Sequence, residues 1–330
     1  MPTNHNTPGK GIAPIDEGMF VEIHGIPQWV TIRGSDRRNP VLLFLHGTGF
    51  ALSAMAPFFA PWEKDFTLVQ WDQPGAGATY AKNGAAEMAD LSVESITRDG
   101  IAVAEFVRRR LGVHKVVLLA LSGGTLIGLK MVKTRPELFA AYVGSGQVVH
   151  WARQEGLCYQ LILQRARAAG DTAAIAELEN IGPPPYKEVA SVAVKGKYAN
   201  AMTPAEQAEL PALLAAMQPP GADVAYIAKG LPRFDPRAVS MASFEKLMSD
   251  FAEFDACRLG VKFDVPMFFF QGEHDLHLPT SEVRAYAAEI EAPQKMIVEL
   301  PNAGHSAFFL RNEFLRLLKL HVRTPALTRD

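Results

Sequence analysis

The chain has 330 residues, of which 48% are hydrophobic and 21% are charged. At roughly 150 residues per domain, this length predicts about two domains, and the composition is typical of a globular protein with a sizeable core. The 33 Lys and Arg residues nearly balance the 35 Asp and Glu residues, which gives a formal net charge of −2. This balance argues against nucleic acid or an anionic membrane as a partner bound through bulk charge.

The two cysteines, Cys158 and Cys257, are too few for a disulfide framework. No cluster of His, Cys and carboxylate residues has the spacing of a metal site. We therefore expect neither a metal nor a cofactor. Residues 1–18 are polar, lack the apolar segment of a signal peptide, and are interpreted as a flexible N-terminal leader. Because no apolar run reaches the roughly 18 residues of a membrane-spanning helix, we expect a cytoplasmic protein.

Strand patterns begin directly after this leader. Apolar runs at 19–23 and 28–33 flank a His-Gly-Ile-Pro turn, which predicts a hairpin. The run 41–45 is apolar throughout, as expected of a parallel strand that is covered on both faces, and similar runs follow it. These runs occupy residues 41–45, 66–71, 115–120, 140–143, 265–270 and 295–300.

Helical patterns alternate with these strands. Ser92 is a candidate N-cap for a helix over 93–111, in which apolar residues recur at spacings of three and four. Further helices are predicted over 125–133, 280–291 and 308–321. The alternation predicts the α/β class, with a mostly parallel central sheet flanked by helices.

The segment 147–262 interrupts this alternation. It contains no convincing apolar strand but several helical stretches, including 157–169 and 172–180, and it has proline clusters at 183–185, 219–220 and 232. We interpret it as a helical cap, or lid, inserted into a core domain formed by residues 19–146 and 263–330. An insertion after the carboxyl end of a strand lies over the region where such sheets bind ligands.

The strongest chemical signal is the segment 120–124, which reads Ala-Leu-Ser-Gly-Gly. It follows an apolar strand and precedes a helix, which is the context of a nucleophile elbow. The serine of such an elbow lies on a sharp, strained turn, so the residues two before and two after it must be small. Ala120 and Gly124 meet this requirement, although alanine replaces the usual first glycine. The pattern predicts Ser122 as a catalytic nucleophile.

A serine hydroxyl needs a base to take its proton, and proteins with this elbow carry an acid and then a histidine later in the chain. His305 follows the run 295–300, so a loop at the carboxyl end of a strand would present it. Asp275 follows the preceding strand in the same way, and it would orient the imidazole and stabilise its cation. Glu273 remains a competitor for the role of the acid.

The oxyanion that develops on the substrate needs two hydrogen-bond donors. We expect one from the backbone N–H of Gly123, immediately after the nucleophile. The other is expected from the loop after strand 41–45, where residues 45–49 read Leu-His-Gly-Thr-Gly. Glycines in this loop let the backbone approach a substrate closely. We assign the second donor to Thr48, with Gly47 as the alternative.

These residues carry a resemblance to the α/β-hydrolases, and more closely to their proline iminopeptidase branch. The matching segments are 45–49, the elbow at 120–124, and 72–77, which reads Asp-Gln-Pro-Gly-Ala-Gly. Asp275 and His305 complete the match. The resemblance implies an α/β-hydrolase fold with a helical cap, and release of an N-terminal residue, often proline, from short peptides or arylamides through an acyl-enzyme.

The sequence departs from that branch at three places. The branch usually has His-Gly-Gly-Pro-Gly where residues 46–50 read His-Gly-Thr-Gly-Phe, Arg where Pro74 stands, and Gly-x-Ser-Trp-Gly at the elbow. Two of these departures line the expected acyl pocket, so substrate preference does not follow from the resemblance. In the family, glutamates of the cap hold the free amine of the substrate. The candidates for that role here are Glu155, Glu177, Glu179 and Glu188.

The leading hypothesis is a cofactor-independent serine hydrolase that acts on a small molecule or a short peptide, with N-terminal proline as the first choice of substrate. A carboxylesterase acting on small esters is the alternative. A binding protein with an α/β-hydrolase fold and a degenerate catalytic triad is a further alternative, but here all three triad positions are filled.

Overall fold

The computed structural model describes residues 13–47, 51–217, 230 and 235–323. Its strands form one sheet in the order β1-β2-β4-β3-β5-β6-β7-β8. β1, β2 and β4 pair antiparallel, and all the other pairs are parallel, so the predicted mostly parallel α/β sheet is confirmed. The strands are β1 (Ile15–Ile23), β2 (Ile26–Gly34), β3 (Val41–Leu45), β4 (Thr67–Asp72), β5 (Val116–Leu121), β6 (Phe139–Ser145), β7 (Met267–Gly272) and β8 (Lys295–Leu300).

The predicted hairpin is formed by β1 and β2, with Ile23 paired to Ile26 next to the turn. β1 begins at Ile15 rather than at Met19, so residues 15–18 belong to the sheet and not to the expected leader. Polar Asp16 and Glu17 hide this start in the sequence, because an antiparallel edge strand exposes alternate side chains. Residues 1–12 of the expected leader lie outside the described residues.

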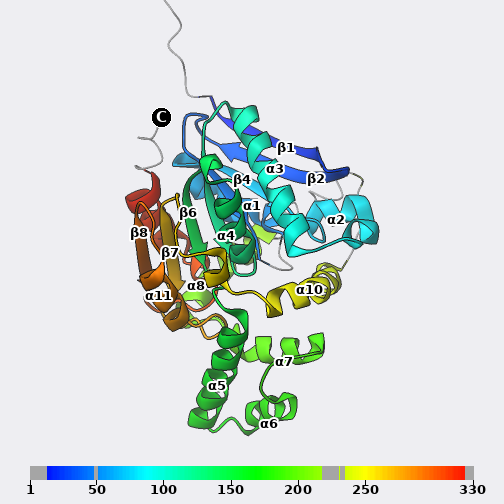
Figure 1. Cartoon of the computed structure of the whole chain (residues 1–330), viewed down its shortest axis with the longest axis vertical. Coiled ribbons are helices and arrows are strands. Elements are labelled where there is room, and N and C mark those ends of the chain that lie inside the picture. Colours follow the sequence, from blue (N-terminus) through cyan, green and yellow to red (C-terminus); the bar gives the residue numbers. More distant parts are fainter. Residues whose placement is uncertain (1–12, 48–50, 218–229, 231–234, 324–330) are drawn as a thin grey trace, which may run out of the picture.

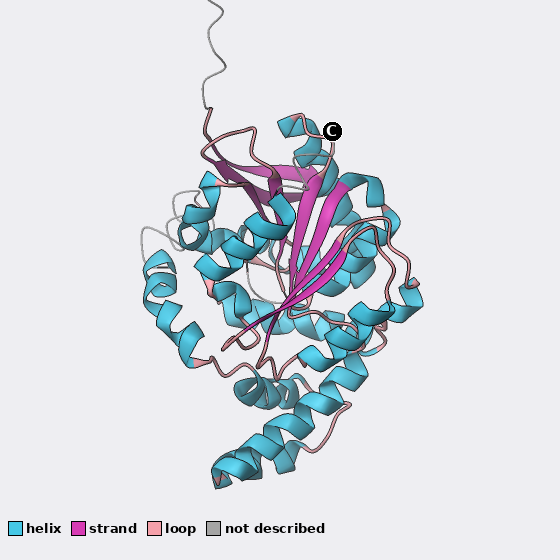
Figure 2. Cartoon of the chain, turned by 90° about the vertical axis from the view of Figure 1, so that its left-hand side faces the viewer, coloured by secondary structure: helices cyan, strands magenta, loops and turns pink. Residues whose placement is uncertain are grey.

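Alternate residues of each inner strand enter two separate cores, one on each face of the sheet. In β3, Leu43 and Leu45 enter the first core, whereas Leu42 and Phe44 enter the second. This period of two follows from the pleat of a strand. It explains why the inner strands are largely apolar, since both of their faces are covered (Figure 2).

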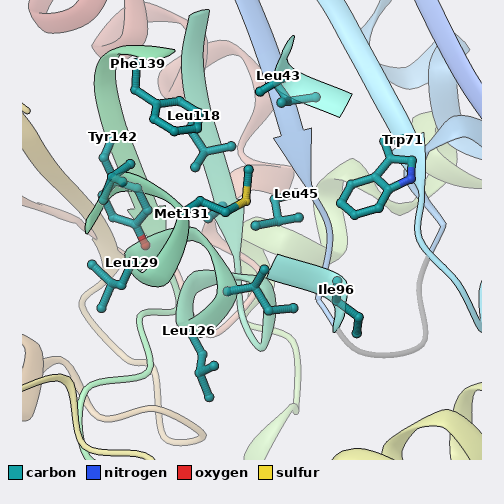
Figure 3. Close-up of a cluster of buried hydrophobic side chains, with 14 of the residues drawn as sticks. Leu43, Leu45, Trp71, Ile96, Leu118, Leu126, Leu129, Met131, Phe139 and Tyr142 are labelled. Atoms are coloured by element: carbon teal, nitrogen blue, oxygen red, sulfur yellow. The ribbon is translucent and has the colours of Figure 1, made fainter. Parts of the chain in front are cut away.

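Helices from different parts of the chain cover the two cores. Figure 3 shows Leu126, Leu129 and Met131 of α4 packed against the strands in the first core. Full burial of such a side chain contributes about 1.5–3 kcal/mol. Residues of α3 and α11 also enter the first core, and residues of α1 and α12 enter the second. The helices outside the 147–262 segment are α1 (Ala56–Phe59), α2 (Gly77–Asn83), α3 (Val93–Leu111), α4 (Gly124–Thr134), α11 (Thr280–Glu289) and α12 (Arg311–Leu317).

The described part of the segment 147–262 contains helices and no strand. These inserted helices connect β6 to β7, and α5, α6 and α7 extend from the lower end of the molecule in Figure 1. The prolines at 219–220 and 232 lie outside the described residues. The inserted helices are α5 (Trp151–Ala169), α6 (Thr172–Ile181), α7 (Val189–Ala199), α8 (Pro204–Met217) and α10 (Pro236–Ala252).

The first inserted helix starts earlier than its apolar pattern predicts. α5 begins at Trp151 and not at residue 157, because the ring of His150 caps it by accepting a hydrogen bond from the backbone N–H of Arg153. α8 contains Pro211 in its interior, a residue that normally signals the end of a helix. None of the helices in the described part of the chain is long and apolar enough to cross a membrane.

Candidate active site

Ser122 lies on the turn between β5 and α4 in a strained conformation. Its φ of 51° is in the left-handed region, which non-glycine residues rarely adopt. Backbone hydrogen bonds hold the turn. The Ser122 N–H donates to the carbonyl of Ser145 at 2.9 Å, and the N–H of Thr125 donates to the Ser122 carbonyl at 2.8 Å. Observed strain of this kind is typical of functional sites.

The elbow is sharp because small residues let neighbouring backbone segments approach it. A side chain at Gly124 would meet the carbonyl oxygen of His46 at 2.4 Å. The methyl group of Ala120 lies 2.9 Å from the place that a side chain at Gly128 would occupy. The two small positions expected from the sequence are therefore close-packed, and Gly128 is a third such position that the sequence analysis missed.

The structure brings Ser122, His305 and Asp275 into one hydrogen-bonded chain. Nε2 of His305 lies 2.9 Å from Oγ of Ser122, and Nδ1 lies 3.0 Å from Oδ2 of Asp275. The Asp275 side chain is fully buried, and that of His305 is 13% exposed. With Nδ1–H donating to Asp275, Nε2 is left to accept the proton of the serine hydroxyl.

The backbone after β7 fixes the acid of this chain. The other carboxylate oxygen of Asp275, Oδ1, accepts hydrogen bonds from the N–H groups of His277 and Leu278, each at 2.9 Å. The competing carboxylate of Glu273 is about half exposed and faces the N–H of Asn302. The structure therefore places Asp275, and not Glu273, against the imidazole.

The loop that carries His305 is anchored by an inserted helix. Glu206 of α8 is 1% exposed. Its Oε1 accepts the N–H of Gly304 at 2.9 Å, and its Oε2 accepts the N–H of Thr203 at 2.8 Å. Thr203 and Glu206 form a capping box at the start of α8, so a T-x-x-E pattern in the sequence marks this residue. That pattern indicates a helix start but not the contact with Gly304.

His277 is a second residue of the site that the sequence analysis did not assign. Its ring centroid lies 4.6 Å from that of His305, and its buried Nδ1 has no hydrogen-bond partner among the described residues. Burial lowers the pKa of His277 well below the usual range, and the nearby Lys195 ammonium and His305 act in the same direction. His277 is therefore neutral beside the catalytic histidine candidate.

Two of the three expected oxyanion donors lie next to the serine. Gly123 is the N-cap residue of α4. A side chain at Gly47 would meet the Ser122 Cβ at 2.9 Å and the Gly123 nitrogen at 3.5 Å, so the backbone of Gly47 passes directly over the elbow. Thr48 lies outside the described residues.

His46 fixes the start of this loop from inside the protein. Its Nδ1 lies 2.8 Å from the Gly47 carbonyl oxygen, and its Nε2 accepts the backbone N–H of Gln73 at 3.2 Å. The side chain of Gln73 donates back to the carbonyl of His46 at 2.9 Å. Burial lowers the pKa of His46 to about 4, so the neutral ring joins the loop to the Asp-Gln-Pro-Gly-Ala-Gly segment.

A cavity of about 540 Å³ opens from Ser122 toward the inserted helices. This volume lies within the range of roughly 300–1,000 Å³ that small-molecule sites occupy. Trp151, Val192, Phe244 and Phe308 contribute apolar walls, and no carboxylate lines the cavity among the residues that the structure describes. The described residues also contain no group of three or more His, Cys, Asp or Glu side chains that could hold a metal ion.

None of the four glutamates considered for amine binding lines this cavity. Glu177 and Glu179 are exposed and ion-paired with a lysine and an arginine, and Glu188 is exposed. Glu155 is buried and faces an adjoining cavity, where its carboxylate binds the ammonium group of Lys195. Of the four glutamates, Glu155 is therefore the one that is buried and lines a cavity.

Comparison with known proteins places this geometry in a family. A model of the alpha/beta hydrolase family matches residues 42–316. The chain belongs to the alpha/beta hydrolase family. The match spans the strand ends that carry the elbow, Asp275 and His305, and the fold predicted from the resemblance is confirmed.

Individual relatives carry several activities in their names. A protein of Bacillus subtilis (strain 168) named "Probable aminopeptidase YbaC" is 27% identical over 307 residues, which cover 90% of this chain and 92% of that protein. The structure of a proline iminopeptidase-related protein from Thermus thermophilus matches with a TM-score of 0.64 at 18% identity, covering 94% of this chain and 99% of that one. A thermophilic esterase from Thermogutta terrifontis matches with a TM-score of 0.53 at 15% identity and the same coverage.

Proposed function

We propose that this chain is a serine hydrolase that works through an acyl-enzyme. The observation that carries the proposal is the hydrogen-bonded chain from Ser122 through His305 to Asp275, which starts at a strained elbow and opens into a cavity. Nε2 of His305 takes the serine proton as Oγ attacks the substrate carbonyl, and Asp275 stabilises the imidazolium that forms. His305 then returns the proton to the departing amine or alcohol. A water molecule then attacks the acyl-enzyme by the same steps, and the acyl group leaves Ser122 as a carboxylic acid.

The oxyanion of each tetrahedral intermediate requires donors that are already in place. We propose the backbone N–H groups of Gly123 and of the loop at Gly47 and Thr48 for this role. Support comes from the close approach of Gly47 to the elbow. The network of His46 with Gln73 holds the start of that loop, so little reorganisation is needed when charge develops.

Within this class we propose first an aminopeptidase that releases an N-terminal residue, such as proline, from a short peptide or arylamide. The support is the aminopeptidase named among the relatives, which aligns over 90% of this chain. A carboxylesterase is the second candidate. It is favoured by the cavity walls, because no carboxylate among the described lining residues is available to bind a free amine.

The cytoplasmic location and the division of the chain into a core domain and a helical cap stay predictions.

A matched pair of substrates separates the two candidates. Prolyl arylamide and N-acetylprolyl arylamide differ only in the free amine, and a nitrophenyl ester of similar size reports esterase activity. An aminopeptidase cleaves the first and rejects the second. An esterase cleaves the nitrophenyl ester, and its rate on the arylamides is not raised by a free amine. Activity that survives in Ser122→Ala would refute the shared mechanism, and Ser240→Ala, which removes another cavity-lining serine, is the control.

A further inference from the structure

A second cavity of about 400 Å³ lies among the inserted helices. We call it the distal chamber. Trp151, Glu155 and Tyr159 of α5 line it, and their spacing of four residues places them on one face of the helix. The other walls come from the proline segment 183–185 with Tyr186, from Val192 of α7, and from α10. The proposed acyl transfer does not use this chamber.

We call the cavity of about 540 Å³ at Ser122 the catalytic cavity. The distal chamber and the catalytic cavity share part of their walls. Trp151, Val192 and Phe244 line both cavities. The rings of Trp151 and Phe244 lie 6.4 Å apart, centroid to centroid. Changes of rotamer at these three shared residues would join the two spaces and let one ligand extend along both.

Glu155 carries the only charge among the described residues that line the distal chamber, and an ion pair with Lys195 neutralises it. The Glu155 carboxylate lies 2.5 Å from the Lys195 ammonium, and their side chains are 4% and 0% exposed. A buried pair of this kind presents no net charge, whereas an isolated charged ligand would have to lose its hydration without a partner. The remaining lining is largely rings, prolines and aliphatic groups, so the chamber suits a neutral, apolar group.

We propose that the distal chamber binds the far end of an elongated substrate whose carbonyl group lies at Ser122. The group that it accepts is a neutral, apolar chain or ring, attached to the acyl side beyond the first few carbon atoms. This inference rests on the proposed serine hydrolase function. It builds on the second candidate, a carboxylesterase, and narrows the substrate class from any small ester to one with a long apolar acyl group.

Two glycines allow each cavity to be filled separately. Gly156 lines the distal chamber, and a side chain there would have no atom within 4 Å. Gly196 lines the catalytic cavity, and a side chain there would meet only Asn200, at 3.5 Å. Both glycines lie inside helices, where leucine is the better helix former. Gly156→Leu and Gly196→Leu are therefore matched variants that should fold.

The test compares nitrophenyl butanoate with nitrophenyl decanoate. In the unmodified protein, kcat/KM should be at least about tenfold higher for decanoate, because burial of the additional methylene groups favours the longer chain. Gly156→Leu should remove this preference and leave butanoate unchanged, whereas Gly196→Leu should impair both esters. An ester of equal length that ends in a carboxylate or an ammonium group should show no gain. A preference for decanoate that persists in Gly156→Leu would overturn the proposal.

A binding measurement separates this proposal from the proposed function. Decanamide is titrated calorimetrically into the Ser122→Ala and Ser122→Ala/Gly156→Leu proteins, neither of which can turn it over. We expect binding to weaken by about tenfold or more in the double variant. Equal affinities would refute the distal chamber even if the esters were hydrolysed. Loss of hydrolysis of all substrates, together with chamber-dependent binding, would refute only the hydrolase function.

Discussion

The strand ends and the inserted helices form opposite halves of the catalytic cavity. The strand-end half is held by backbone: the Ser122 N–H is bonded to Ser145, and the Asp275 carboxylate is bonded to two N–H groups. The helical half presents side chains such as Val192 and Phe244, and none of its described lining residues carries a charge. Under the proposed function, the strand ends would supply the reaction chemistry, and the packing of the helices would set the selectivity.

The largest effect should come from a small change in the strand-end half. Asp275→Asn preserves size but replaces the acceptor of the His305 Nδ1–H by an amide, which favours the wrong tautomer of the imidazole. We expect kcat to fall by about 10⁴-fold while the protein stays folded. The measurement is single-turnover acylation beside circular dichroism. Glu273→Gln is the control, and a comparable loss in that variant would transfer the role of the acid to Glu273.

This contrast also explains what the sequence could predict. Parallel strands have their carboxyl ends at one edge, so chain order alone brings Ser122, Asp275 and His305 to one place. The contacts of Glu206 with Gly304 and of Glu155 with Lys195 depend on how helices pack across long sequence separations. No local pattern encodes such packing. The pattern at Glu206 indicates only its own helix start.

The pH dependence of the free energy of unfolding tests whether the buried ring of His46 in the strand-end half stays neutral. Burial lowers the pKa of His46 to about 4 in the folded chain, from about 6.5 when unfolded. Between pH 6.5 and pH 4, the imidazole of His46 is therefore protonated in the unfolded chain but neutral in the folded chain. Relative to His46→Asn, the free energy of unfolding should fall by about 1.4 kcal/mol per pH unit between pH 6.5 and pH 4.

Denaturant titrations of both proteins across this pH range measure the difference in free energy of unfolding. Asp72 and Glu87, whose pKa values burial raises to about 6 and about 7, are present in both proteins, so their contributions cancel. Above pH 6.5 the difference should be constant. A difference that stays flat down to pH 4 would mean that His46 is not held in its neutral form.

The smallest of these effects should come from the contact that joins the two halves. A glutamine at position 206 keeps one acceptor oxygen, so Glu206→Gln cannot bind the N–H groups of both Gly304 and Thr203. A looser His305 loop should lower kcat by about tenfold and leave KM nearly unchanged. Glu209→Gln, on the same helix, is the control. Equal kcat values in the two variants would mean that the inserted helices do not position the histidine.

The central claim is that Ser122 is the nucleophile of an acyl-transfer site, and covalent trapping tests it most directly. The protein is treated with a fluorophosphonate and analysed by intact-mass and peptide-mapping mass spectrometry. We expect one adduct per chain, located on Ser122, absent from Ser122→Ala and formed much more slowly in Asp275→Asn. No adduct on the unmodified protein, or an adduct retained by Ser122→Ala, would contradict it.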